Sequence, residues 1–290
     1  MKRTAWCLLA ALIVCGAPAA TAAQSPEDGG KTPQAHERAG GEAVNNGQDM
    51  TRPLTRVDLR YEYQNSPHLS GSKDDAHIVT VRMDKPFDLG PRWKLATRLD
   101  LPLMFTDRVS KDNTQGNTHF GVSDVLAQAM LVNIASERFA WAAGAQIILP
   151  TATEDEMGMG KYRVVPTLGM RWATPEMLTG SWVALAARWD KDFAESRSDA
   201  TKVNELQLAP MVNIPLPDQW FVNLFPSTDI RCNLGDKRPG DSGRWFVPAN
   251  VLVGKMLTRD IVTSVEVGVP IIQDYHVYDF KVEARIGFFF

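Results

Sequence analysis

His119 and Ser123 are the residues whose types and spacing come closest to hydrolytic chemistry. A lipid hydrolase needs a serine nucleophile, a histidine base and a group that orients the histidine, all within hydrogen-bond reach. The spacing of this pair differs from the His-x-Ser pattern of outer-membrane phospholipases, and the sequence indicates no orienting group. We therefore assign no catalytic residue and expect no enzyme, while a lipid-active enzyme stays open as an alternative.

Metal chemistry has one candidate, the acidic run Glu154, Asp155 and Glu156. Consecutive carboxylates can attract Ca²⁺, but a solvated acidic loop explains the same pattern. The remaining histidines lack the spacing of metal ligands. They are His36, His68, His77 and His276. Since no glycine-rich phosphate-binding motif is present either, we expect no metal and no cofactor.

The charge balance, the lengths of the apolar runs and the cysteine content exclude further classes of protein. The chain has 31 basic and 34 acidic residues, so it lacks the basic excess of a nucleic-acid-binding protein. After the first two dozen residues no apolar run approaches the length of a membrane-spanning helix. Cys232 is the one cysteine beyond residue 15, and a lone thiol is typical of an exported chain without an intramolecular disulfide.

The first 53 residues have two different compositions. Residues 1–23 combine Lys2 and Arg3 with an apolar run and then small residues, which is the layout of a cleaved secretory signal peptide. Residues 24–53 are rich in Gly, Ala, Asn, Gln and charge and show no apolar periodicity, so we expect a disordered periplasmic lead-in. Whether this segment also acts as a plug stays open.

From residue 54 onward, apolar and polar residues alternate with a period of two, which is typical of β-strands. The last strand is the clearest example, with Val282, Ala284 and Ile286 on one face and Lys281, Glu283 and Arg285 on the other. An aromatic residue at the end of such a strand, here Phe290, is typical of outer-membrane barrels. Twelve segments show this alternation: 57–64, 79–84, 93–101, 125–131, 139–149, 162–172, 183–190, 205–214, 220–232, 245–256, 261–271 and 278–290. An even number of antiparallel strands predicts a closed transmembrane up-and-down β-barrel over residues 54–290.

The connections between these segments alternate in length. Gaps such as 106–117 and 150–161 are long and polar, whereas gaps such as 88–92 and 258–260 are tight turns. Long outer loops and short periplasmic turns are the rule for outer-membrane barrels. Outward aromatic residues should form two girdles at the membrane interfaces, and a soluble all-β protein would not need them. The girdle residues are Trp93, Trp141, Trp172, Trp189, Trp220, Trp245 and Phe290.

The inward faces of the predicted strands carry charges of both signs. They include Arg60, Glu62, Arg82, Arg98, Asp100, Asp124, Arg171, Arg188, Asp190, Glu205, Arg231, Glu266, Glu283 and Arg285. Twelve strands give a backbone radius of roughly 12 Å, which leaves a narrow interior. These side chains can line a conduit for small solutes, or they can fill the barrel with ion pairs.

The middle of the chain resembles the outer-membrane family named for the meta-pathway of phenol degradation. The matching stretches are Gly121-Val-Ser-Asp124, Pro150-Thr-Ala-Thr153 and Gly158-Met-Gly-Lys-Tyr162, followed by Pro166. Ser123 and Ala152 stand where members of that family tend to have glycine. The resemblance implies an outer-membrane barrel that moves small molecules, aromatic or hydrophobic compounds among them.

We therefore predict a passive channel or transporter for small molecules in the bacterial outer membrane. Its expected partners are outer-membrane lipid and lipopolysaccharide, the barrel-assembly machinery and a small-molecule solute, with no nucleic acid. A sealed barrel with a structural or adhesive role through its loops is the main alternative.

Overall fold

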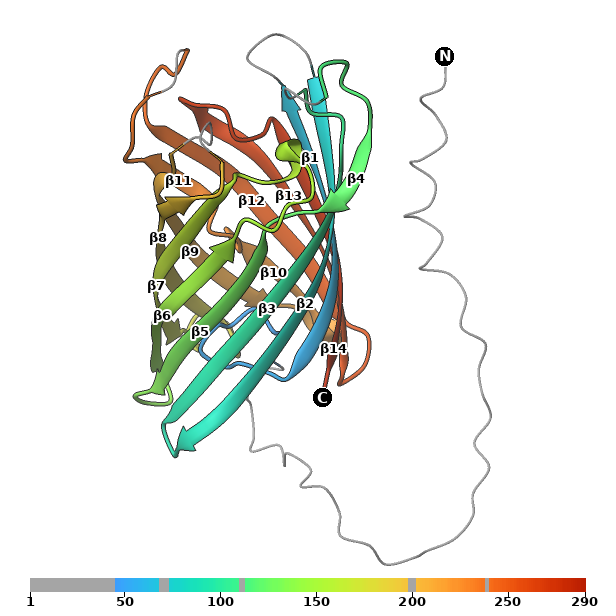
Figure 1. Ribbon diagram of the computed structural model, residues 1–290. Coiled ribbons are helices and arrows are strands. Elements are labelled where there is room, and N and C mark those ends of the chain that lie inside the picture. The colour runs from blue at the N-terminus through green and yellow to red at the C-terminus, as the bar shows by residue number, and fades with distance from the viewer. Residues whose placement is uncertain (1–44, 68–72, 110–112, 198–201, 238–239) are drawn as a thin grey trace, which may run out of the picture. The chain divides into compact units, whose positions relative to one another are not determined.

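The computed structural model describes residues 45–67, 73–109, 113–197, 202–237 and 240–290. The predicted signal peptide and residues 24–44 of the predicted lead-in lie outside the described residues. All fourteen strands of the described residues belong to one antiparallel sheet (Figure 1). Its strands are β1 (Arg56–Pro67), β2 (Lys73–Gly90), β3 (Trp93–Thr106), β4 (His119–Val122), β5 (Val125–Ile134), β6 (Phe139–Leu149), β7 (Lys161–Ala173), β8 (Trp182–Glu195), β9 (Asn204–Pro215), β10 (Trp220–Leu224), β11 (Ile230–Asn233), β12 (Trp245–Met256), β13 (Ile261–Gln273) and β14 (Phe280–Phe289). Two single-turn 3₁₀ helices, η1 (Asp155–Met157) and η2 (Pro217–Gln219), lie in connections.

The sheet closes on itself with twelve strand positions. Strand β1 pairs with both β2 and β14, so the first and last strands of the chain are neighbours in the sheet. Strands β10 and β11 both pair with β9 and β12 and together occupy one position. Strands β4 and β5 likewise both pair with β3. The fourteen strand segments therefore form a closed twelve-stranded barrel, as the alternation predicts.

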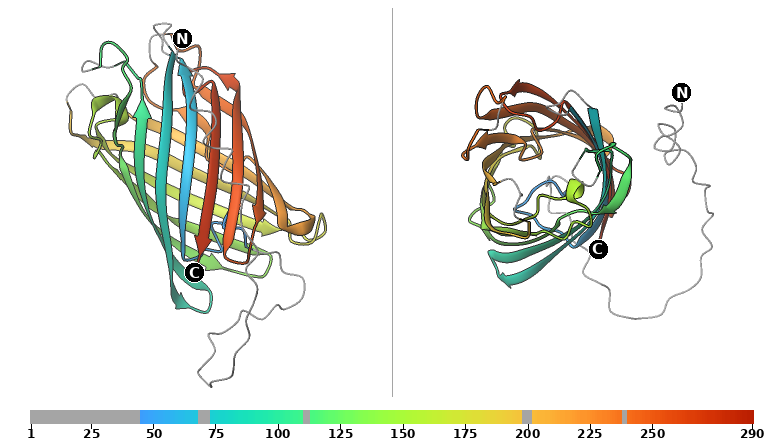
Figure 2. Two further views of the ribbon diagram at one scale, coloured as in Figure 1. Left: turned by 90° about the vertical axis from the view of Figure 1, so that its right-hand side faces the viewer. Right: turned by 45° about the horizontal axis from the view of Figure 1, so that its top comes forward.

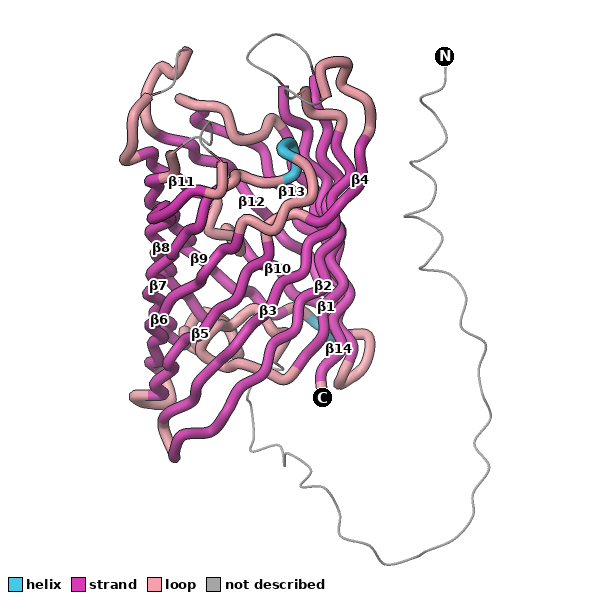
Figure 3. The backbone as a smooth tube through the Cα atoms, in the orientation of Figure 1, coloured by secondary structure: helices cyan, strands magenta, loops and turns pink. Residues whose placement is uncertain are grey.

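The two ends of the barrel differ in their connections. The upper end in Figure 1 carries the long connections, and the lower end carries tight turns (Figure 3). The end of β14 lies at the short-turn end, beside the turns. The length rule assigns the short-turn end to the periplasm and the long-loop end to the outside.

Alternation along each strand separates an apolar exterior from a polar interior. In β13, Val265, Val267 and Val269 are exposed on the outer surface, whereas Ser264 and Glu266 are buried inside. A closed barrel satisfies every strand hydrogen bond within the wall, so this surface is suited to contact lipid.

The predicted girdle residues lie on the outer surface, most of them near the ends of their strands, and Trp189 lies in the middle of β8 beside Asn204 at the start of β9. Trp93 packs edge-to-face against Trp141, with ring centroids 5.6 Å apart. Trp172 packs against Phe139, and Lys255 lies over the ring of Trp220. Trp189, Trp245 and Phe290 are exposed. Their position at the height of the membrane interface stays a prediction.

Candidate functional site

The barrel interior contains the charged residues that the alternation assigns to it. Most of them line one of two cavities: Arg60, Glu62, Arg82, Arg98, Asp100, Asp124, Arg188, Arg231, Glu266 and Glu283. The other four, Arg171, Asp190, Glu205 and Arg285, form ion pairs with other interior residues. The inward orientation follows from the strand register, and the role of these residues in transport stays a prediction.

Two adjoining cavities occupy the interior. The larger one, of about 350 Å³, extends from the short-turn end to the middle of the barrel. The smaller one, of about 240 Å³, extends toward the long-loop end, where Asp124 and Arg163 line it. Arg60, Glu62, Arg82 and Glu283 line both cavities and therefore separate them. Cavities of this size are suited to small molecules.

One wall of the larger cavity is dominated by arginines that share carboxylates. Asp84 accepts a hydrogen bond from Arg56 Nε at 2.5 Å and from Arg98 Nε at 2.7 Å. Arg82 donates two bonds to Asp100, at 2.7 and 2.6 Å. Asp58, which is fully buried, lies within ion-pair distance of three arginines, which are Arg56, Arg60 and Arg285. Glu283 also accepts from Arg60 Nη1, at 3.1 Å, so four carboxylates serve five arginines.

A second wall, formed by residues of β9, β11, β13 and β14 together with Asp229, has more carboxylates than basic groups. Lys281 contacts Asp229 and lies 2.9 Å from Glu266 Oε1. Arg231 lies within ion-pair distance of Asp229 and Glu205. The first wall has an excess of arginines and the second an excess of carboxylates, and this separation of charge creates an electric field in the interior.

Residues 45–53 fold into the barrel at the short-turn end, which corrects the expectation that they are disordered. Asp49 forms an ion pair with Arg171 at 3.1 Å, and Asn46 Nδ2 donates to Asn213 Oδ1 at 3.0 Å. Met50 packs where a side chain at Gly169 would lie. Figure 2 shows this segment, in blue, inside the ring of strands. The segment is polar because its partners are the polar interior residues, so it lacks the apolar periodicity by which folded segments are recognised.

A second segment, residues 225–229, interrupts the strand formed by β10 and β11 and folds inward. Phe225 has φ of 50°, and the chain leaves the wall there and returns at Ile230. Ser227 Oγ donates to Glu266 at 2.8 Å, and Thr228 Oγ1 accepts from Arg188 at 2.8 Å. The alternation predicts one uninterrupted strand here, because Ile230 and Cys232 continue the outward alternation that Trp220 begins. Cys232 is a free, buried thiol.

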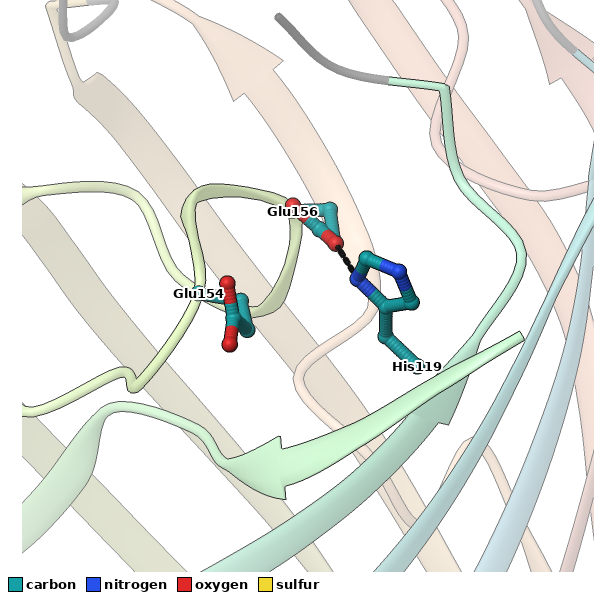
Figure 4. Close-up of side chains that lie close together, drawn as sticks. All are labelled: His119, Glu154 and Glu156. Carbon is teal, nitrogen blue, oxygen red and sulfur yellow. Dashed lines mark hydrogen bonds and ion pairs between the residues drawn. The ribbon is translucent and has the colours of Figure 1, made fainter. Parts of the chain in front are cut away.

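A third segment, residues 150–160, lies across the long-loop end, where Figure 2 shows η1 inside the ring. Glu156 is buried, and its Oε1 is 2.5 Å from His119 Nδ1 (Figure 4). Met159 N donates to Asp124 Oδ2 at 2.9 Å, and Arg197 pairs with Asp155. Of the acidic run, Glu154 is exposed, as a solvated loop predicts, whereas Asp155 and Glu156 are held by Arg197 and His119.

The arrangement of His119 and Ser123 does not form a catalytic pair in this structure. Ser123 Oγ donates to the carbonyl oxygen of Met157 at 2.5 Å, whereas His119 is bonded to Glu156. His119, Glu154 and Glu156 have potential metal-ligand atoms within 4.8 Å of one another (Figure 4). The hydrogen bond between His119 and Glu156 accounts for two of these three groups without an ion.

Tyr278 lies inside the barrel, although the alternation predicts that it faces outward. It is fully buried against Phe246, and its hydroxyl donates to Asp229 Oδ2 at 3.3 Å. Strand β14 begins only at Phe280, so the parity of the strand does not extend to residue 278. In the same loop, Tyr275 Oη donates to Glu205 Oε1 at 2.6 Å, and burial together with that carboxylate raises the pKa of Tyr275.

Residues 70–228 match the model of the family described as "Putative MetA-pathway of phenol degradation", which covers more than half of the chain. The chain belongs to this family. This match confirms the resemblance of the central segments to that family. No curated protein matches the chain in sequence.

Solved structures share the fold of this family member. An outer membrane channel from Pseudomonas putida F1 superposes with a TM-score of 0.66 at 14% identity, over 88% of this chain and 100% of that one. The NanC porin superposes with a TM-score of 0.51 at 14% identity, over 81% of this chain and 98% of that one. The outer membrane phospholipase A of Escherichia coli has a TM-score of 0.47 at 10% identity, over 86% and 97% of the two chains. The first two likenesses confirm the prediction of an outer-membrane barrel fold. Within the part of the chain that the structure describes, no helix is long and apolar enough to cross a bilayer.

Proposed function

We propose that the protein is a passive channel for small molecules in the bacterial outer membrane. The observation that carries this proposal is a barrel with an apolar exterior around two adjoining cavities lined by charged side chains. Charged groups that face an interior hydrate it, and water-filled interiors allow solutes to cross the membrane. The fold shared with an outer membrane channel and a porin supports the same conclusion.

The charged side chains that line the two cavities favour solutes with a polar or ionised group. The family description points to aromatic compounds, and an aromatic solute that carries a polar group satisfies both constraints. The three segments that fold inward, residues 45–53, 225–229 and 150–160, narrow the interior, which argues for solutes of low mass. The channel should be surrounded by outer-membrane lipid and lipopolysaccharide and assembled by the barrel-assembly machinery.

Single-channel recording of the refolded protein in planar lipid bilayers tests the proposal. We expect discrete conductance steps, and neutralising Arg98 by Arg98→Gln should change their size because its guanidinium lines the larger cavity. The matched control is Arg138→Gln, since Arg138 is exposed in a turn and should leave the steps unchanged. A correctly folded barrel that passes no current at any voltage would contradict the proposal and favour the sealed, structural alternative.

A further inference from the structure

Within the part of the chain that the structure describes, Arg188 is an interior arginine without a carboxylate partner. Its Nη1 donates to the neutral hydroxyl of Thr228 at 2.8 Å, and its Nε has no hydrogen-bond partner. Among the described residues, no carboxylate oxygen lies within the 4.0 Å of an ion pair with Arg188. The other interior arginines differ, because each is within ion-pair distance of an acid: Arg60, Arg82, Arg98, Arg163, Arg231 and Arg285.

The positive charges around Arg188 make the binding of an anion beside it more favourable. Arg98 and Arg82 converge on the same cavity from β3 and β2. Their carboxylates are engaged, since Asp100 is paired with Arg82 and Asp84 is shared by Arg98 and Arg56. A positive charge removed from bulk water and held near two like charges is unfavourable unless an anion compensates it.

The cavity beside Arg188 has the size and the hydrogen-bonding groups for a small ligand. Its volume is about 350 Å³, and Gln128, Gln207 and Thr228 line it together with the arginines. Amide and hydroxyl groups can orient a bound solute, while the planar guanidinium matches the geometry of a carboxylate better than that of a spherical ion.

We propose that Arg188, flanked by Arg98 and Arg82, binds the carboxylate of a small organic acid inside the barrel. The inference rests on the proposed channel function and deepens it by naming the class of solute. It assigns Arg188 the role of the residue that retains an anionic solute in the larger cavity.

Equilibrium binding to the refolded full chain in detergent micelles tests this site without requiring conduction. The probe is 4-fluorobenzoate, followed by ligand-observed ¹⁹F NMR, and its neutral isostere 4-fluorobenzamide reports partitioning into the micelle. We expect saturable binding of the carboxylate alone, weakened by added KCl because salt screens the ionic contact. Arg188→Gln should weaken that binding about tenfold or more, the cost of one charge-assisted contact.

Two further variants separate the role of the site from an effect on folding. Since no carboxylate depends on Arg188, its replacement leaves no acid unpaired, and circular dichroism should show an intact barrel. Arg188→Lys keeps the charge and loses the planar donor fork, so its binding should lie between those of the wild type and Arg188→Gln. Arg138→Gln, in an exposed turn, should bind like the wild type.

The outcomes distinguish this inference from the proposed function. Equal binding of 4-fluorobenzoate by the wild type and a folded Arg188→Gln variant, or no binding by either, overturns the site and leaves a conducting channel in place. A barrel that carries no current but binds the carboxylate through Arg188 supports the site and overturns the channel. Equal binding of acid and amide shows micelle partitioning only and overturns the site.

Discussion

Lys281 and Arg231 compensate the carboxylates of the acidic wall, and Lys281 is the more deeply buried of the two. Lys281 is 3% exposed, contacts Asp229 and lies 2.9 Å from Glu266. Removing one partner of a buried ion pair leaves the other charges uncompensated, which costs more than the pair itself contributes. We therefore predict that Lys281→Met lowers the free energy of unfolding by about 3 kcal/mol, measured by urea titration of the protein in lipid vesicles.

The control for this residue is Lys85→Met, because Lys85 is exposed and its ammonium lies over the ring of Phe87 rather than beside a carboxylate. Its effect should stay within about 0.5 kcal/mol. Adding Asp229→Asn to Lys281→Met removes one of the uncompensated acids and should recover part of the loss. If the single and double variants are equally unstable, repulsion among the acids is not the cause.

At the scale of elements, the alternation of apolar and polar residues predicts on which face of a strand each side chain lies, because that depends only on the local sequence. The side chains of a strand alternate whatever the strand pairs with, so Val265 and Glu266 could be assigned to opposite faces without a structure. The segments that fold inward could not be predicted in this way. Asn46 is bound by Asn213, which is 167 residues away, and residues 225–229 interrupt a strand whose two halves keep the same outward parity. Polar segments that pack in a polar interior carry no periodic pattern.

The segment 45–53 should be held in the barrel mainly by the charge of Asp49. Asp49 Oδ2 lies 3.1 Å from Arg171 Nε, and its Oδ1 accepts from Thr51 N at 2.8 Å. Asp49→Asn keeps the turn to Thr51 and removes the ion pair. We predict that proteinase K then cleaves within residues 45–53 roughly tenfold faster, because local opening costs less free energy. Single-channel conductance should rise in the same variant.

The comparison for this element is Asp218→Asn, which changes a carboxylate in an exposed turn at the same end. It should alter neither the proteinase K cleavage within residues 45–53 nor the conductance. Faster cleavage with unchanged conductance would show that the segment opens but does not limit the current. Unchanged cleavage in Asp49→Asn would mean that the ion pair does not hold the segment.

For the whole molecule, the position of the bilayer around the barrel follows from its exterior. On β8, Val183 pairs with Trp172 at one predicted girdle, and Trp189 belongs to the other. Leu185 is exposed between these two levels, with 47% of its surface accessible. If lipid surrounds this band, a charge at residue 185 must be placed in hydrocarbon.

We predict that Leu185→Arg lowers the free energy of unfolding from lipid vesicles by about 2 to 4 kcal/mol, the cost of an arginine near the midplane of a barrel. Met177→Arg adds the same charge at an exposed residue in the connection between β7 and β8, where water can hydrate it, and should cost less than about 1 kcal/mol. The ratio of the two effects is the informative quantity, since both variants add one positive charge to the outside of the same barrel. Equal costs would contradict the assignment of the band to the bilayer core, and with it the membrane position of the whole barrel.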